Sequence, residues 1–167
     1  MNTKITLIFL CVCMSFTMQA AFAEVPETRV QAIFLYKFIE NTNWPDNKSG
    51  LRVGFFGDTP VQAEFEKMLK ARNNSNISVR KIDLSATNQC DVVFLPTSQN
   101  SKFNLLLESA KNSSILIITE DGGLIRKGAG ISFLKEDESI SFVVNKASLD
   151  KRRLQMTGAL LSLGKQI

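Results

Sequence analysis

Histidine is absent from all 167 residues of the chain, which removes the side chain that most catalytic sites use at neutral pH. Neither a Ser-His-Asp triad nor a Cys-His pair can form, and no zinc site with a histidine ligand is possible. The candidate carboxylates stand apart at expected strand ends: Asp58, Asp83, Asp91, Glu120 and Asp121. Acidic residues at such positions commonly serve as turn and cap residues, so we predict no two-carboxylate active site and no enzymatic activity.

Cysteine is almost as scarce. Cys11 and Cys13 lie in an N-terminal segment that we expect to be removed, which leaves Cys90 as the one thiol of the mature chain. One thiol can form neither an internal disulfide nor a thiolate cluster, so we predict an unpaired Cys90 and no metal site. Two interpretations of Cys90 stay open: a small buried apolar residue, the common role of a free cysteine, or a bridge to another chain.

Charge of one sign is not concentrated in the sequence. The chain has 20 Lys and Arg against 16 Asp and Glu, and Lys151-Arg152-Arg153 is the one basic cluster. Nucleic-acid-binding proteins normally carry a concentrated basic face, often with an aromatic platform, so we predict no nucleic-acid partner. After residue 23, no apolar run approaches the roughly 20 residues of a membrane-spanning helix.

The first 23 residues have the three-part layout of a secretory signal peptide. Lys4 gives a positive start, an apolar run extends from Ile5 to about Met18, and Ala21-Phe22-Ala23 places small residues where signal peptidase cleaves. This run is short for a membrane span, although a retained anchor helix is the alternative. We expect cleavage before Glu24, export of the chain, and a single domain over residues 24–167.

Apolar periodicity over residues 27–120 predicts alternating helices and strands. The expected helices span residues 27–41, 61–72 and 101–111, and the expected strands span residues 51–57, 77–82, 91–96 and 114–120. Short apolar runs such as Val92-Val93-Phe94-Leu95 are typical of central strands covered on both faces. Strands that alternate with helices at these spacings favour right-handed parallel crossovers.

The pattern changes after residue 130. Residues 131–134 and 140–144 alternate apolar with polar, which predicts an antiparallel hairpin at the end of the sheet. Asn145 is a good N-cap, and leucines recur through residues 149–163, which predicts one final helix over residues 146–163. The predicted fold is an α/β three-layer sandwich, with a mostly parallel sheet, a C-terminal antiparallel hairpin and helices on both faces.

The glycine-rich segment Asp121–Gly130 is the most unusual part of the chain. It follows the carboxyl end of a buried strand, where open α/β sheets usually bind ligands. It lacks the Gly-x-Gly-x-x-Gly order, and no Lys-Ser or Lys-Thr pair follows a glycine. We therefore predict no nucleotide site and no cofactor.

Within this segment, Leu124 and Ile125 are followed by Arg126 and Lys127. One interpretation is an exposed apolar surface with a charged border, as at protein interfaces. The other is that both side chains lie beneath the edge of the sheet. Trp44, the only tryptophan, has two interpretations as well: a core residue at the end of the first helix, or a partner hot spot.

Two hypotheses from different classes follow. In the leading one, Trp44, Leu124, Ile125 and Arg126 bind a protein partner. In the alternative, Asp58, Gly122 and Gly123 capture a small ligand at the strand ends, which requires a concave pocket with converging polar groups.

Several segments resemble the YfiR family of exported bacterial proteins. They are residues 33–39 closing on Trp44-Pro45, residues 53–60, residues 90–95, and residues 115–163, with Gly130-Ile131-Ser132-Phe133 and Phe142-Val143-Val144-Asn145 among them. No single motif is specific, but their order and spacing cover almost the whole mature chain.

The resemblance implies a periplasmic, non-enzymatic regulator with an α/β sandwich. The family's named member forms dimers and binds the periplasmic sensor domain of an inner-membrane diguanylate cyclase, which lowers cyclic di-GMP and restrains biofilm growth. By this resemblance we expect a homodimer acting on such a cyclase or on another sensor, such as a histidine kinase. One departure concerns redox control: that member contains disulfides, whereas here Cys90 stands at a matching strand start and Gly54 provides no second thiol.

Overall fold

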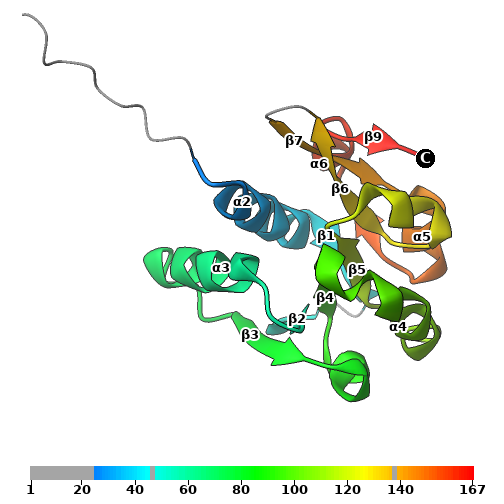
Figure 1. Cartoon of the computed structure of the whole chain (residues 1–167), viewed down its shortest axis with the longest axis horizontal. Helices are drawn as coiled ribbons and strands as arrows, with labels where there is room; N and C mark the ends of the chain where they lie inside the picture. The colour runs from blue at the N-terminus through cyan, green and yellow to red at the C-terminus, as the bar shows by residue number, and fades with distance from the viewer. Residues whose placement is uncertain (1–24, 46–47, 137–138) are drawn as a thin grey trace, which may run out of the picture.

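The computed structural model describes residues 25–45, 48–136 and 139–167, so the predicted signal peptide lies outside the described residues. A seven-stranded sheet in the order β3-β2-β4-β5-β6-β7-β9 forms its centre (Figure 1). The strands from β3 to β6 pair in parallel, β6 and β7 are antiparallel, and β7 and β9 are parallel. The strands are β2 (Leu51–Phe56), β3 (Ile77–Ile82), β4 (Val92–Leu95), β5 (Leu116–Thr119), β6 (Ile131–Glu136), β7 (Ser139–Val144) and β9 (Lys165–Gln166).

Helices cover both faces of the sheet and complete the three layers. Figure 1 shows α2 and α3 lying on the side of the molecule away from α4. The α-helices are α2 (Glu27–Glu40), α3 (Pro60–Ala71), α4 (Phe103–Ser109), α5 (Lys146–Lys151) and α6 (Gly158–Leu161). The 3₁₀ helices are η3 (Leu84–Gln89), η4 (Thr97–Lys102) and η5 (Gly122–Lys127). The predicted α/β fold class is confirmed.

Alternating side chains of the strands feed two separate cores, because neighbouring residues of a strand point to opposite faces. Phe94 belongs to the core beneath α2 and α3, whereas Val93 and Leu95 belong to the core beneath α4 and η5. Burial on both faces explains why β4 reads as a continuous apolar run. In the first core, Phe38 of α2 lies 4.8 Å from Phe142 of β7 between ring centroids.

The predicted final helix over residues 146–163 is wrong. Residues 146–163 instead form α5, a short strand β8 (Gln155–Met156) and α6, and β8 pairs with β1 (Thr42–Asn43). Helix α5 ends in a Schellman motif: the Leu154 N–H donates to Leu149 O at 3.0 Å, the Arg153 N–H donates to Asp150 O at 2.9 Å, and Arg153 has φ +58°. Leu154, which follows the reversal, is completely buried.

The predicted hairpin is present, but it does not form the edge of the sheet. After α6 the chain returns, and β9 pairs with β7 on its outer side. A two-residue strand such as β9 carries too little apolar periodicity to be found in a sequence. Its position matters because it forms one wall of the groove described next.

Candidate functional site

The glycine-rich segment folds as η5, and this explains where its apolar side chains lie. An Asp121 carboxylate oxygen accepts the Gly123 N–H at 2.7 Å and caps the helix start. Gly128 ends the helix at φ +116°, a conformation that favours glycine. Leu124 and Ile125 therefore turn inward and are only 5% and 6% exposed. The predicted exposed apolar surface at these two residues is wrong, and the second interpretation, burial beneath the sheet, is the one found.

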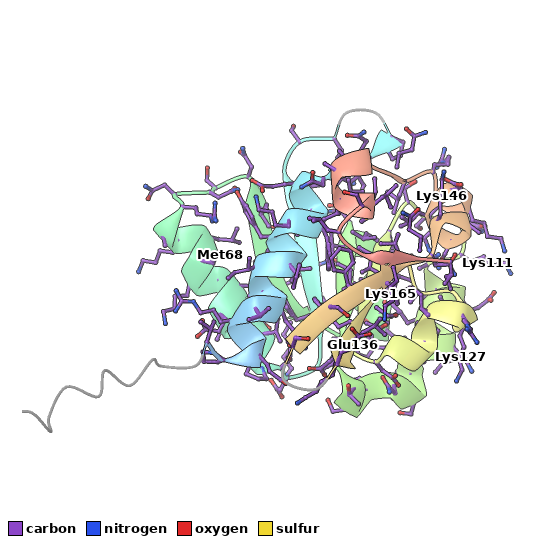
Figure 2. The ribbon with its side chains drawn as sticks, turned by 90° about the horizontal axis from the view of Figure 1, so that it is seen from above. Met68, Lys111, Lys127, Glu136, Lys146 and Lys165 are labelled. Atoms are coloured by element: carbon purple, nitrogen blue, oxygen red, sulfur yellow. The ribbon has the colours of Figure 1, made fainter. Side chains whose placement is uncertain are left out.

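Beside η5 lies an open groove of about 780 Å³, which we call the edge groove. Buried Ile125 and Val143 line it, exposed Arg126 and Lys165 add positive charge, and Ile167 is 50% exposed. Figure 2 shows Lys165 beside Glu136, with which it forms an ion pair. The lining residues are Gly122, Gly123, Ile125, Arg126, Leu134, Val143, Lys165, Gln166 and Ile167.

The structure brings together some of the predicted site residues and separates others. Gly122, Gly123, Ile125 and Arg126 share the edge groove. Asp58 does not join them: it follows β2, which β4 separates from β5, and its exposed carboxylate pairs with Lys81 Nζ at 2.6 Å. The predicted convergence of Asp58 with Gly122 and Gly123 is therefore wrong.

Trp44 lies in the core beneath α2 and α3, with 8% of its surface exposed. This supports the core interpretation of the residue over the hot-spot interpretation. Its indole Nε1 is buried and has no hydrogen-bond partner among the described residues.

The carboxylates at the carboxyl ends of the strands are used as local caps. A Glu120 oxygen accepts the Thr97 N–H at 2.8 Å, and Asn100 Nδ2 donates to an Asp121 oxygen at 2.6 Å. Asp83 caps η3 by accepting the Ser85 N–H at 2.9 Å. In the described part of the chain, no group of three or more acidic or cysteine side chains could hold a metal ion.

Asp91 lies at the opposite, amino end of the sheet, and sequence reasoning did not single it out as a site. Its carboxylate is 3% exposed and accepts from Arg52 Nε at 3.0 Å, from Arg52 Nη2 at 3.1 Å, from the Arg52 backbone N–H at 2.9 Å and from Lys48 Nζ. Burial alone would raise the pKa of this carboxyl, but the hydrogen bonds from Arg52 and Lys48 outweigh it and hold the pKa below its ordinary value. Asp91 is thus a buried, ionised anchor for two cations.

Cys90, next to Asp91, is a free cysteine that is 2% exposed. Gly54 on β2 makes room for it: a Cβ at Gly54 would lie 2.7 Å from Cys90 Sγ and 2.6 Å from Ile82 Cδ1. Such burial favours the apolar interpretation over a bridge to another chain.

Comparison with solved structures gives the class of fold. The chain is similar to a conserved domain protein from Vibrio cholerae, with a TM-score of 0.59 at 11% identity over 86% of this chain and 60% of that one. An ABC domain in complex with L-Trp from Streptococcus pneumonia gives a TM-score of 0.58 at 11% identity over 83% and 59% of the two chains. The chain therefore has the α/β fold of these domains and spans about 60% of their length.

A substrate binding protein with adhesive properties from Clostridium difficile, in its ligand-free, open structure, is also similar. It gives a TM-score of 0.50 at 15% identity over 81% of this chain and 58% of that one. At such low identities the likeness concerns the fold alone. Comparison with curated protein sequences gives no match.

The family is shown by a sequence model. Residues 28–165 match the model of the YfiR/HmsC-like family, DUF4154, and the chain belongs to that family. This family of periplasmic regulators supports a periplasmic regulatory role for the chain. Within the described ranges, none of the helices is long and apolar enough to cross a membrane.

Proposed function

We propose that this protein binds the periplasmic sensor domain of an inner-membrane diguanylate cyclase, or of a similar sensor, and represses it. The observation that carries the proposal is the match of residues 28–165 to the YfiR/HmsC-like family. Repression lowers cyclic di-GMP and restrains biofilm growth. The protein acts without catalysis, as a homodimer, after export and removal of residues 1–23.

The edge groove is the surface that we assign to the partner. It is open, largely apolar at its base, and bordered by the exposed side chains of Arg126 and Lys165. Protein interfaces commonly combine an apolar centre with a polar rim, and arginine is enriched in them. Lys165 already pairs with Glu136, so Arg126 is the residue that we expect to meet an acidic side chain of the partner.

This assignment retains Arg126 from the sequence hypothesis and changes the role of its neighbours. Ile125 contributes to the base of the groove, whereas Leu124 and Trp44 support the fold from within the core. The proposed partner segment carries apolar side chains for the base and at least one carboxylate for Arg126.

The test is crosslinking of the tagged mature protein on the periplasmic side of membranes, followed by identification of the captured proteins. Arg126→Glu reverses the charge at the groove, and Lys127→Glu is its matched control, since Lys127 is the next exposed residue on η5 but does not line the groove. Cyclic di-GMP is measured in parallel in cells that produce each variant.

We expect the wild type and Lys127→Glu to capture a cyclase or another sensor and to keep cyclic di-GMP low. Arg126→Glu should lose the partner and raise cyclic di-GMP. Capture of no membrane sensor by the wild type would contradict the proposed function. Equal capture by both variants would contradict the assignment of the groove alone.

A further inference from the structure

The strand β3 forms one border of the seven-stranded sheet, and none of the described residues pairs with its outer side. On the inner side, all six residues of β3 pair with β2 in one continuous parallel register. In Figure 1, no helix or strand of the described chain lies beyond β3. The other border is β9, which has only two residues, so β3 is the long open edge of the sheet.

The pairing with β2 decides which backbone groups of β3 are left open. The Gly57 N–H donates to Ile82 O at 3.1 Å, so the even-numbered residues of β3 turn their N–H and C=O groups toward β2. Backbone groups alternate in direction along a strand. Ile77, Val79 and Lys81 therefore turn their N–H and C=O groups outward, where no described residue meets them.

Exposed edges of natural sheets are usually protected, and most of the common devices are missing from β3. The strand contains no proline and no glycine, and its register has no bulge. Its two cations are engaged within their own chain: Lys81 Nζ pairs with an Asp58 carboxylate oxygen at 2.6 Å, and Arg80 Nη1 donates to Gln89 Oε1 at 3.1 Å. Neither charge is directed over the open edge.

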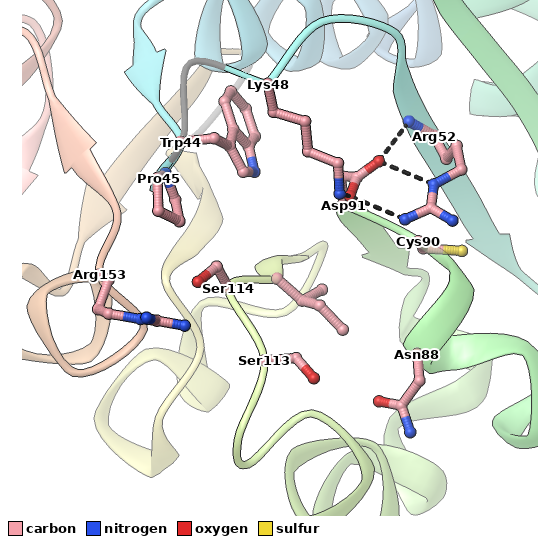
Figure 3. A pocket seen from close by; sticks show the side chains of 11 residues that line it. Trp44, Pro45, Lys48, Arg52, Asn88, Cys90, Asp91, Ser113, Ser114 and Arg153 are labelled. Carbon is pink, nitrogen blue, oxygen red and sulfur yellow. Dashed lines mark hydrogen bonds and ion pairs between the residues drawn. The ribbon is translucent and has the colours of Figure 1, made fainter.

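The direction of Arg80 is fixed by a second contact. Arg80 Nη2 lies 3.7 Å from Cys90 Sγ, at the start of β4, and Figure 3 shows this sulfur directed away from Ser114. Because β2 lies between β3 and β4, the arginine side chain crosses over β2 to reach the sulfur. The residue of β2 opposite Arg80 is Gly54, which has no side chain to block this path. Arg80 thus extends away from the open edge.

The open groups of β3 fit a second copy of the same strand. They are spaced evenly about Val79, so an antiparallel copy related by a twofold axis places Val79 opposite Val79 of the second copy and Ile77 opposite its Lys81. Opposite residues with inward-facing groups exchange both N–H···O bonds in an antiparallel pair. Every open N–H and C=O of the strand then has a partner.

The side chains are compatible with this register. Ile77 and Val79 are half-buried and pack against the core beneath α2 and α3. The pairing covers their exposed parts with the aliphatic stem of Lys81 and with Val79 of the second copy. On the other face of the sheet, Arg80 stands opposite Ser78. No two cations are directly opposite, a placement that would destabilise the pair.

We propose that the outer edge of β3 is a dimer interface, at which two copies of this chain pair their β3 strands antiparallel about Val79 and join their sheets. The inference rests on the proposed function in one respect, because it gives the homodimer a surface. This surface lies at the opposite border of the sheet from the edge groove. One strand pair buries less than a standard interface of about 1,600 Å², so we expect weak association.

The first test measures self-association of the purified mature protein by sedimentation velocity over a series of concentrations. Val79→Pro removes the open N–H at the centre of the pairing, and an edge strand tolerates proline where its N–H faces solvent. Val79→Thr is the matched control, since it keeps the N–H and the branched side chain. Thermal unfolding of each variant checks that the fold is retained.

We expect the wild type and Val79→Thr to pass from monomer toward dimer between roughly 1 µM and 1 mM. Val79→Pro should dimerise at least about tenfold more weakly, because both central hydrogen bonds are lost. A wild type that stays monomeric over this range overturns the proposal. A folded Val79→Pro that dimerises as the wild type does also overturns it.

Disulfide crosslinking tests the register without proline. Val79→Cys places two thiols on opposite residues, at a Cα separation of about 5.5 Å that a disulfide can span. Ser78→Cys places them on a diagonal of roughly 7–8 Å, although Ser78 is the more exposed position. The oxidant is diamide, which takes up the two protons and two electrons that leave the thiols as the S–S bond forms. Cys90 is buried, so the wild type serves as the blank.

We expect covalent dimers of Val79→Cys to form at least about tenfold faster than those of Ser78→Cys. Equal rates, or faster crosslinking of Ser78→Cys, overturn the proposal. These measurements use the isolated protein, so their failure would leave the proposed binding of a membrane sensor standing. Failure to capture a sensor would equally leave the dimer interface standing.

Discussion

Replacement of Gly54 by cysteine should create an internal disulfide with Cys90. Gly54 lies on β2 and Cys90 stands at the start of β4, the neighbouring parallel strand. A Cβ at position 54 would lie 2.7 Å from Cys90 Sγ, so a new thiol there is within reach of a disulfide. In the described part of the chain, the position facing Cys90 on β2 is a glycine, so Cys90 has no neighbouring thiol there.

The size of the effect follows from two opposing contributions. The bridge would close a loop of about 37 residues, and the loss of chain entropy in the unfolded state corresponds to roughly 4 kcal/mol of stabilisation. The new Cβ would also lie 2.6 Å from Ile82 Cδ1, and such overpacking costs about 1–3 kcal/mol. The reduced variant should therefore be less stable than the wild type, and oxidation should raise its melting temperature by roughly 10 °C.

The assay combines thiol titration of the denatured protein with thermal melts before and after reduction. Gly54→Ser is the matched control, since its side chain has nearly the same size but forms no bridge. It should show the overpacking cost and no response to reductant. If oxidised Gly54→Cys retains two free thiols, or if reduction leaves its melting temperature unchanged, the placement of Gly54 against Cys90 is refuted.

Three further predictions concern stability and are measured by urea unfolding. The pKa of Asp91 is lower in the folded state than in the unfolded state, where it is about 3.9. Ionisation of Asp91 therefore stabilises the fold above about pH 3.9, and this stabilisation is lost as the pH falls toward the folded-state pKa. Asp91→Asn should therefore lower the free energy of unfolding by about 2 kcal/mol at pH 7, because charge-assisted hydrogen bonds are lost. Between pH 7 and pH 3 the free energy of unfolding of this variant should fall less than that of the wild type. An equal fall in both proteins would contradict this assignment. Phe38→Ala empties a fully buried site beside Phe142 and should cost about 3–5 kcal/mol, whereas Ile33→Ala, at a 42% exposed position on the same helix, should cost about 1 kcal/mol or less. Asn145→Ala removes the N-cap of α5 and the hydrogen bond to Ile125 O at 2.9 Å, and should cost about 1–2 kcal/mol; a value near zero would show that neither contact stabilises the fold.

The parallel part of the sheet could be predicted because both of its faces are buried. Burial on two sides requires short apolar runs such as residues 92–95, and these are visible in the sequence without knowledge of their neighbours. Helix α3 could be placed for a local reason as well: Thr59 accepts the Val61 N–H, and Pro60 occupies the first helical position.

The C-terminal region could not be predicted in the same way. Leucines recur at helical spacing through residues 149–163, yet the chain turns at Arg153, a residue type that rarely adopts a left-handed conformation. The turn is stabilised by burial of Leu154 in a core to which distant helices and strands contribute. Local periodicity contains no information on that contact.

The candidate sites show the same division. The Asp-Gly-Gly sequence at residues 121–123 is a local signal for a capped turn, but the inward direction of Leu124 and Ile125 depends on the core beneath η5. A pocket at the amino ends of the strands, which Trp44, Asp91 and Arg153 line together, was not visible in the sequence, because these residues come from segments separated by up to about 110 residues.

Composition and local pattern determined the exclusion of histidine chemistry, the α/β class, and the order of the α-helices and of the strands of the seven-stranded sheet from α2 through β7. These properties depend on which residue types are present and on patterns over a few neighbouring residues, so a single sequence is enough to reveal them. Only the tertiary structure decided that Trp44 and Ile125 are buried and that Arg126 borders an open groove. Those relations depend on which distant segments pack together, and packing is a property of the whole folded chain.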